Sequence, residues 1–261
     1  MRSLFLATAL ATAFAASPAF ADKAGIAING ESFVVTTSDG GRLAASDLVG
    51  ATMTMTTPEG MAFDLRIDSA SPAKERPSLS LLSLSVRDAG TGQWRPFCQK
   101  DAYGRAAGFP VAGAWDGNGH FIADKSRWFI TCTSGSQGKC ILFGYDPWGR
   151  GPHGEDLVPY YEACQHMVRA DYDGSRWAHT RNGTIIDIWD HLGIQTDAAA
   201  DDPAFHFEAG WSARSAVCVA RTRWPDLLSR DTLVRSAPRL DGPCNEAIAT
   251  AEGALLFNRA R

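Results

Sequence analysis

The chain of 261 residues lacks several features that would assign it to a well-defined functional class. Its formal net charge is −4 and it has no cluster of basic residues, which argues against a nucleic-acid-binding surface. After residue 21 no segment approaches the ~20 apolar residues of a membrane-spanning helix. Neither a GxSxG nor an HExxH motif occurs, so no catalytic signature indicates a reaction. We expect no nucleic-acid partner, no transmembrane anchor and no cofactor.

The first 21 residues have the pattern of a secretory signal peptide. Arg2 supplies the positive start, residues 4–16 form a short apolar run, and Ala19-Phe20-Ala21 has the small-x-small pattern that signal peptidase recognises. The apolar run is too short to span a bilayer. We therefore expect cleavage after Ala21 and export to the periplasm or the medium.

All six cysteines lie beyond this segment. An even number of cysteines in an exported chain favours disulfides, because no reducing system keeps thiols free outside the cytosol. No pair has the CxxC spacing of a zinc site, so we expect no metal there. Cys132 and Cys140 border a Gly/Ser-rich connection; they either close a hairpin tip together or reach other elements, for example Cys164. The expected disulfide cysteines are Cys98, Cys132, Cys140, Cys164, Cys218 and Cys244.

Alternating apolar and polar residues predict antiparallel β-structure in the first part of the mature chain. Residues 51–57 and 61–68, joined by a short turn with Pro58 and Gly60, have the period of two of a β-hairpin. Residues 79–87 continue the pattern as a further strand. We expect a β-rich lobe over residues 22–95.

The rest of the chain, residues 96–261, mixes helix and strand signals. Residues 157–170 form the best helix, with Asp156 as its cap and Pro159 in its first turn. Asn182-Gly183 favours a type I′ turn, which predicts a hairpin that pairs His179 with Ile186. We expect strands at residues 128–131, 141–145, 205–211 and 216–220, and helices at 225–234 and 243–257. The predicted fold is α+β and mainly β, with antiparallel sheets and hairpins, a central helix and C-terminal helices, stapled by disulfides and packed as one globular unit.

Several segments resemble the ADYC-domain family, exported bacterial proteins named after an Ala-Asp-Tyr-Cys motif. They are residues 132–140, 144–148 (GYDPW), 163–172 (ACQHMVRADY), 183–187 (GTIID) and 207–211 (FEAGW). The resemblance is good over residues 90–220 and looser over 43–87. Asp173 stands where the motif cysteine is expected. If that cysteine is bonded in relatives, its partner here must be free or must pair elsewhere, for example with Cys244. The resemblance implies no activity, because the family is a domain of unknown function.

Five residues in and after the motif segment carry acid–base or ionic chemistry: His166, Arg169, Asp171, His179 and Asp187. A hydrolase needs a base, an orienting carboxylate and a nucleophile or activated water within hydrogen-bond reach. These residue types are present, but no motif fixes their geometry. Structural roles are equally simple, with Arg169 paired to Asp171 or Asp187 and His179 packed on the hairpin. An exported hydrolase is therefore the alternative interpretation.

Asp171, Asp173 and Gly174 look like the start of a calcium-binding loop. The twelfth position of such a loop needs a Glu, and Asn182 stands there. A turn that ends the helix explains these residues more simply, so we expect no metal site.

Aromatic residues in Gly- and Pro-rich turns are candidates for a binding surface: Trp115, Tyr145 and Trp148. Exposed aromatic rings can bind the apolar face of a sugar, although most tryptophans here lie in strand-like segments, where core packing is usual. Our preferred interpretation is an exported, disulfide-bonded envelope protein that acts as a binding or structural module. Its partner would be an envelope glycan or another protein.

Overall fold

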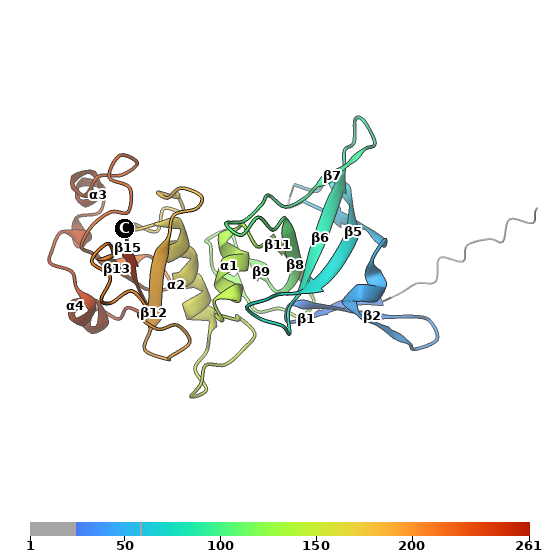
Figure 1. Ribbon diagram of the computed structural model, residues 1–261, viewed down its shortest axis with the longest axis horizontal. Helices are drawn as coiled ribbons and strands as arrows, with labels where there is room; N and C mark the ends of the chain where they lie inside the picture. The colour runs from blue at the N-terminus through green and yellow to red at the C-terminus, as the bar shows by residue number, and fades with distance from the viewer. Residues whose placement is uncertain (1–24, 58) are drawn as a thin grey trace, which may run out of the picture.

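A computed structural model describes residues 25–57 and 59–261. The expected signal peptide, residues 1–21, lies outside the described residues. The molecule is elongated, with a β-rich N-terminal half (residues 25–132) and an α+β C-terminal half (residues 136–261) (Figure 1). Two helices lie where the halves meet, α1 (Ser136–Leu142) and α2 (Val158–Arg169).

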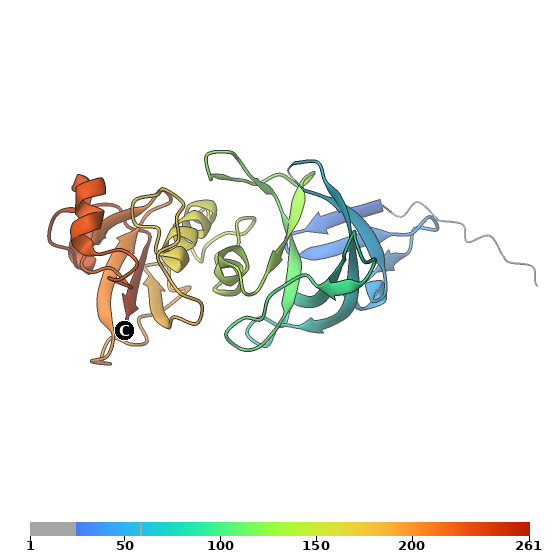
Figure 2. The ribbon, with the colours of Figure 1, turned by 90° about the horizontal axis from the view of Figure 1, so that it is seen from above.

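The N-terminal half contains two antiparallel sheets that share a core (Figure 2). The first has the order β1-β2-β3, with β1 (Gly25–Asn29), β2 (Ser32–Thr36) and β3 (Arg42–Leu43). A short helix, η1 (Ala45–Leu48), follows. The second has the order β11-β8-β6-β5-β4, with β7 beside β6. Its strands are β4 (Thr52–Thr56), β5 (Ala62–Pro72), β6 (Ser80–Arg87), β7 (Trp94–Pro96), β8 (Ala107–Ala112) and β11 (Trp128–Cys132).

The predicted hairpin is confirmed, because Met53 lies opposite Leu65 and Met55 lies opposite Phe63 in β4 and β5. The pairing of β6 with β8 crosses residue 95, where the sequence suggested a lobe boundary, so the sheet continues to Cys132. The division at residues 95 and 96 stays a prediction. A two-stranded ribbon projects from this half and consists of β9 (Ala114–Trp115) and β10 (Phe121–Ile122).

Close packing between β8 and β11 gives a testable expectation at Gly108. A Cβ atom there would lie 2.4 Å from the Thr131 carbonyl oxygen and 3.0 Å from Cys98 Sγ. Gly108→Ala should therefore destabilise the protein by about 1–3 kcal/mol, through strain in a packed interior. Gly117→Ala is the matched control, because its Cβ would meet no atom within 4 Å. Equal urea midpoints for the two variants would contradict this packing.

The C-terminal half has a four-stranded antiparallel sheet of order β12-β15-β13-β14. Its strands are β12 (Ile186–Asp190), β13 (His206–Trp211), β14 (Ala216–Val219) and β15 (Leu256–Ala260). Helix α2 contacts β13 and β15 on the side of the N-terminal half, and α4 (Glu246–Ala251) lies at the far end (Figure 1). Two further helices are α3 (Arg230–Ser236) and η2 (Pro238–Leu240). The predicted class, α+β and mainly β with antiparallel sheets, is confirmed.

Four local predictions are wrong or shifted, chiefly because long-range contacts determine these segments. The Asn182-Gly183 turn forms, but only Gly183 has a positive φ, so it is not type I′, and β12 pairs with β15 instead of with residues 177–181. Residues 141–145 do not form a strand, since Ile141 continues α1 and packs in the core. The C-terminal helix stops at Ala251, after which Gly253 (φ +84°) turns the chain into β15. The predicted helix at 225–234 is shifted to α3.

All six cysteines form disulfides: Cys98–Cys132, Cys140–Cys164 and Cys218–Cys244. The hairpin-tip pairing of Cys132 with Cys140 is wrong, and the alternative in which the two cysteines reach other elements is confirmed. No cysteine in the described chain is free. Although Asp173 stands where the motif cysteine is expected, no thiol is left without a partner, because Cys244 is bonded to Cys218.

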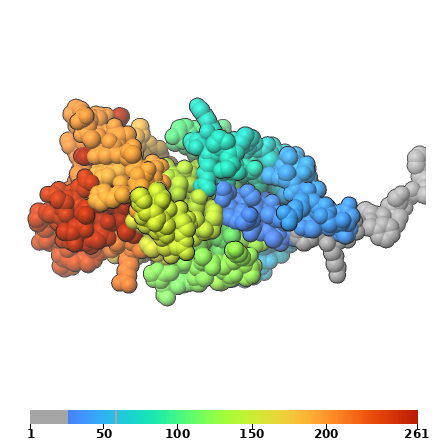
Figure 3. All heavy atoms as spheres, turned by 90° about the horizontal axis from the view of Figure 1, so that it is seen from below, coloured from blue at the N-terminus to red at the C-terminus, as the bar shows by residue number. Residues whose placement is uncertain are grey.

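One hydrophobic core runs through both halves. It includes Phe109 and Val111 of β8 together with Tyr161 of α2 and Trp211 of β13. The loop before β6 adds Arg76, which donates to the Ile141 carbonyl oxygen at 3.1 Å and forms an ion pair with Asp146. Figure 3 shows the yellow-green segment near residue 150 at the surface between the halves. Over the residues with assigned structure, no helix is both long and apolar enough to cross a membrane.

Candidate functional site

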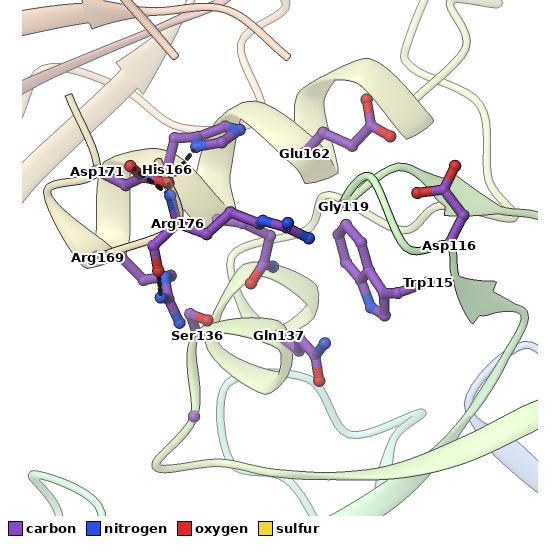
Figure 4. A pocket seen from close by; sticks show the side chains of 12 residues that line it. Trp115, Asp116, Gly119, Ser136, Gln137, Glu162, His166, Arg169, Asp171 and Arg176 are labelled. Atoms are coloured by element: carbon purple, nitrogen blue, oxygen red, sulfur yellow. Dashed lines mark hydrogen bonds and ion pairs between the residues drawn. The ribbon is translucent and has the colours of Figure 1, made fainter. Parts of the chain in front are cut away.

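A pocket of about 500 Å³ opens where α1, α2 and the β9–β10 turn meet. Four residues that the sequence singled out line it: Trp115, His166, Arg169 and Asp171 (Figure 4). The rest of its wall consists of Asp116, Gly119, Gly135, Ser136, Gln137, Glu162, Gln165 and Arg176. Below it is called the first pocket.

The end of α2 brings His166 and Asp171 together. Ala170 adopts a left-handed conformation (φ +52°), so the chain reverses and the Asp171 N–H donates to the His166 carbonyl at 2.9 Å. Asp171 Oδ2 then lies 2.8 Å from His166 Nδ1 (Figure 4). Both Asp171 oxygens also accept the Arg176 backbone N–H at 3.1 Å.

This pair fixes the chemistry of the imidazole. A hydrogen bond donated by His166 Nδ1 to the Asp171 carboxylate places the lone pair of the neutral ring on Nε2. Asp171 is only 1% exposed, whereas His166 is 14% exposed at the pocket. The one hydrogen bond of the His166 ring within the described chain is the bond to Asp171. The arrangement can accept a proton or a hydrogen bond at Nε2.

Two guanidinium groups face the same pocket without an ionic partner. Arg169 donates to the Arg176 carbonyl, and Arg176 Nη1 donates to the Gly117 carbonyl at 2.8 Å. Neither forms an ion pair with a carboxylate of the described chain. Most of their N–H donors are therefore available.

The buried polar groups on the wall of the first pocket differ in whether they have hydrogen-bond partners. Glu162 accepts the Phe121 backbone N–H at 2.7 Å and lies 3.6 Å from His120 Nδ1. Trp115 Nε1 and Gln165 Nε2 are buried and make no hydrogen bond within the described chain. A buried donor without an acceptor costs about 1–3 kcal/mol. Two donors buried behind the pocket surface are thus without an acceptor in the described chain.

Tyr172 of the motif has a structural role. Its ring is fully buried and stacks on Trp211 at 5.3 Å. Its hydroxyl donates to Glu208 Oε1 at 3.0 Å and accepts the Arg223 backbone N–H at 2.7 Å. Burial, with a contribution from Glu208, raises the pKa of Tyr172. Asp173, in the cysteine position, accepts the Ser175 backbone N–H at 3.1 Å and supports the turn.

The other two acid–base candidates lie outside the pocket. His179 Nδ1 is 3.2 Å from the Ala170 carbonyl oxygen, so its ring packs against the end of α2. Asp187 accepts the Ala199 backbone N–H at 2.9 Å. Its neighbour Asp197 pairs with Arg259 through two contacts of 2.8 and 3.0 Å. The structure therefore joins His166 to Asp171, and joins neither of them to Asp187.

The position of Asp187 predicts a pH-dependent effect on stability. Burial raises the pKa of Asp187 above 3.8, and the Asp197 carboxylate adds to the rise. When the pKa of a carboxyl is higher in the folded than in the unfolded state, its protonated form contributes to the free energy of unfolding. That contribution is present at low pH and is lost as the pH rises through the folded-state pKa. Asp187→Asn should therefore unfold at a higher temperature than the wild type at about pH 7, with a smaller difference at about pH 3. A difference that grows on acidification, measured by calorimetry, would contradict this.

The aromatic candidates occupy different environments. Tyr145 is fully buried and its hydroxyl donates to Asp190 at 2.7 Å, so its ring presents no surface to a ligand. Trp148 is half-buried against the β1–β2 turn at Gly30. Trp115 is half-buried between Phe121 and Tyr161, and lines the first pocket.

Some residues of the pocket were missed by the sequence analysis although a signal exists. Glu162, Gln165, His166 and Arg169 have the spacing i, i+3, i+4, i+7, which places them on one face of α2. That polar stripe could have been recognised beside the apolar one. Arg176 has no such signal, because it follows a turn. Within the residues described, no group of three or more His, Cys, Asp or Glu side chains is placed to hold a metal.

Comparison with known protein families gives a match. No curated protein and no solved structure matches the chain. The family model described as ADYC domain matches residues 45–225, which is more than half of the chain. The match includes the six-stranded sheet, both helices of the first pocket, and the Tyr172, Glu208 and Arg223 network. The chain belongs to the ADYC-domain family.

Proposed function

We propose that the protein is an exported binding module of the bacterial envelope, and that its first pocket holds an acidic, oxygen-rich ligand. The observation that carries the proposal is the pair of guanidinium groups, Arg169 and Arg176, that line this pocket without a carboxylate partner. Guanidinium groups bind carboxylates through charge-assisted hydrogen bonds. Export is supported by the signal-like residues 1–21 and by the three disulfides.

The remaining wall favours a sugar acid over a simple anion. Ser136 and Gln137 line the same pocket, and their side chains can form hydrogen bonds with the hydroxyl and acetamido groups of a sugar. The aromatic face of Trp115 adds an apolar contact. A volume of about 500 Å³ suits a ligand of one or two sugar residues. Among envelope glycans, N-acetylmuramic acid combines a carboxylate with these oxygens.

Titration calorimetry with N-acetylmuramic acid and N-acetylglucosamine tests the proposal, since the second sugar lacks the carboxylate. We expect N-acetylmuramic acid to bind at least about tenfold more tightly, and Arg169→Met or Arg176→Met to remove about tenfold of its affinity. Arg214→Met is the control, because Arg214 is exposed and outside the pocket. Equal affinities for the two sugars, or unchanged affinity in both pocket variants, would contradict the proposal.

The His166–Asp171 pair favours a second candidate function, hydrolysis of a bound glycan or peptide. Asp171 orients the ring so that Nε2 can take a proton from a water molecule, as a general base requires. Asp171→Asn should then lower the release of soluble fragments from purified cell-wall polymer by about 100-fold or more, with ligand binding retained. If the wild-type protein releases no fragments, the hydrolase fails and the binding module remains.

A further inference from the structure

A second pocket of about 450 Å³ lies beside the first and shares Ser136 and Arg169 with it. It extends between the turn at residues 101–105 of the N-terminal half, helix α1, the end of α2 and residues 178–186. Five cationic side chains and two carboxylates line it: Arg105, Lys139, Arg169, Arg181 and Arg223, with Glu75 and Asp101. The pocket therefore has an excess of positive charge.

Three of these five cations pair with carboxylates, whereas Arg169 and Lys139 do not. Arg105 pairs with Glu75 and Asp101, at 2.8 and 2.7 Å. Arg181 pairs with Asp226, and Arg223 pairs with Glu208 at 2.9 Å. The Lys139 ammonium makes no ion pair and no hydrogen bond in the described chain. Burial lowers the pKa of Lys139, and nearby Arg223 adds to this effect while Asp101 opposes it. Lys139 is thus a half-buried ammonium group without a direct ion pair in the described chain.

Thr133 also lies at the polar end of the pocket. It is only 1% exposed, and its side chain is a hydrogen-bond partner of the Asp101 carboxylate. The Lys139 ammonium is therefore the unpaired donor that this part of the wall offers to an anion.

Another part of the wall of the second pocket is apolar, which restricts the kind of ligand that the pocket can bind. The pocket has an apolar wall formed by Leu142 at the end of α1, Phe143 after it, Val168 of α2 and Ile186 of β12. Ile185, which also lines it, is 58% exposed, and Tyr103 in the facing turn is 79% exposed. Exposed apolar side chains at a pocket mark a surface that a ligand can cover.

We propose that the second pocket binds a small amphiphilic anion, whose headgroup contacts Lys139 and whose hydrocarbon part lies against Leu142, Phe143 and Val168. A carboxylate or a phosphate monoester supplies the same headgroup chemistry. The ammonium is a point charge and accepts either, without the fixed fork of a guanidinium. The proposal does not rest on the function of the first pocket.

Titration calorimetry of the full mature chain with octanoate, octyl phosphate, acetate and 1-octanol tests the inference. Octanoate and octyl phosphate should bind at least about tenfold more tightly than acetate or 1-octanol. If octanoate binds tightly and octyl phosphate weakly, the headgroup of the natural ligand is a carboxylate. The reverse order of affinities identifies it as a phosphate monoester.

Variants at Lys139 make the test specific. Lys139→Met should weaken octanoate binding at least about tenfold, and Lys139→Arg should retain most of it. Lys125→Met removes the same charge at an exposed turn and should bind as the wild type does. Thermal unfolding of each variant confirms that it is folded. Wild-type affinity in Lys139→Met, or no octanoate binding by the wild-type protein, would overturn the inference. Because N-acetylmuramic acid is titrated separately, this outcome is independent of the first pocket.

Discussion

Arg223→Met is expected to lower the free energy of unfolding by about 3–5 kcal/mol, because it leaves the Glu208 carboxylate buried without its cation. The two side chains are 1% and 0% exposed and are joined by two contacts of 2.9 Å. Glu208 also accepts from the Tyr172 hydroxyl at 3.0 Å and from Asn258 Nδ2 at 2.8 Å. Arg223 additionally donates to the carbonyl oxygens at the end of α2. Its loss should therefore loosen the motif segment against the sheet.

Urea unfolding followed by circular dichroism, with the disulfides intact, measures this effect. Arg127→Met is the control, since Arg127 pairs with Asp124 at 2.7 Å on the surface and such pairs contribute at most about 1 kcal/mol. Adding Glu208→Gln to Arg223→Met should recover part of the loss, because it removes the unpaired charge. A loss in Arg223→Met no larger than that in the control would contradict a buried ion pair at this position.

Removing the Cys140–Cys164 disulfide should cost about 3 kcal/mol of stability and should also weaken the first pocket. The bridge spans 24 residues and joins α1 to α2, and both cysteines are fully buried. Loss of the cross-link increases the entropy of the unfolded chain, which accounts for about 3 kcal/mol. Because the two helices carry the walls of the first pocket, their separation should also misplace Ser136 relative to His166.

The Cys218–Cys244 bridge gives a matched control. It spans 26 residues, so its removal should cost a similar entropy, but it joins β14 to the segment before α4, away from the pocket. Replacing each pair with alanine and measuring both thermal unfolding and binding of N-acetylmuramic acid separates the two effects. Only the Cys140/Cys164 variant should lose affinity. Equal loss of affinity in both double variants would show that the helix–helix bridge has no special role in the site.

The sequence predicted the elements whose signals are local. Alternation over Met53 and Leu65 was sufficient for the first hairpin, because the two strands are adjacent in the chain. Pro159 in the first turn and the stripe that contains Cys164 located α2. The β12–β15 pairing joins residues about seventy positions apart, such as Ile188 and Asn258, and no local period reports it. The Asn182-Gly183 turn was therefore assigned to the wrong strands.

For the candidate site, too, the sequence predicted only the contacts between residues that are close in the chain. His166 and Asp171 are five residues apart at a helix end, so a single reversal at Ala170 joins them. Trp115 comes from the β9–β10 ribbon, and only tertiary packing brings it to α2. The second pocket depends on contacts between the two halves, so no motif around Lys139 could locate it.

The most direct test of the central claim is a crystal structure of the protein with N-acetylmuramic acid. We predict that the sugar occupies the first pocket, with its carboxylate within hydrogen-bond distance of Arg169 or Arg176 and its ring beside Trp115. If the sugar binds elsewhere and the first pocket is empty at saturating ligand, the assignment of the first pocket as the binding site is contradicted.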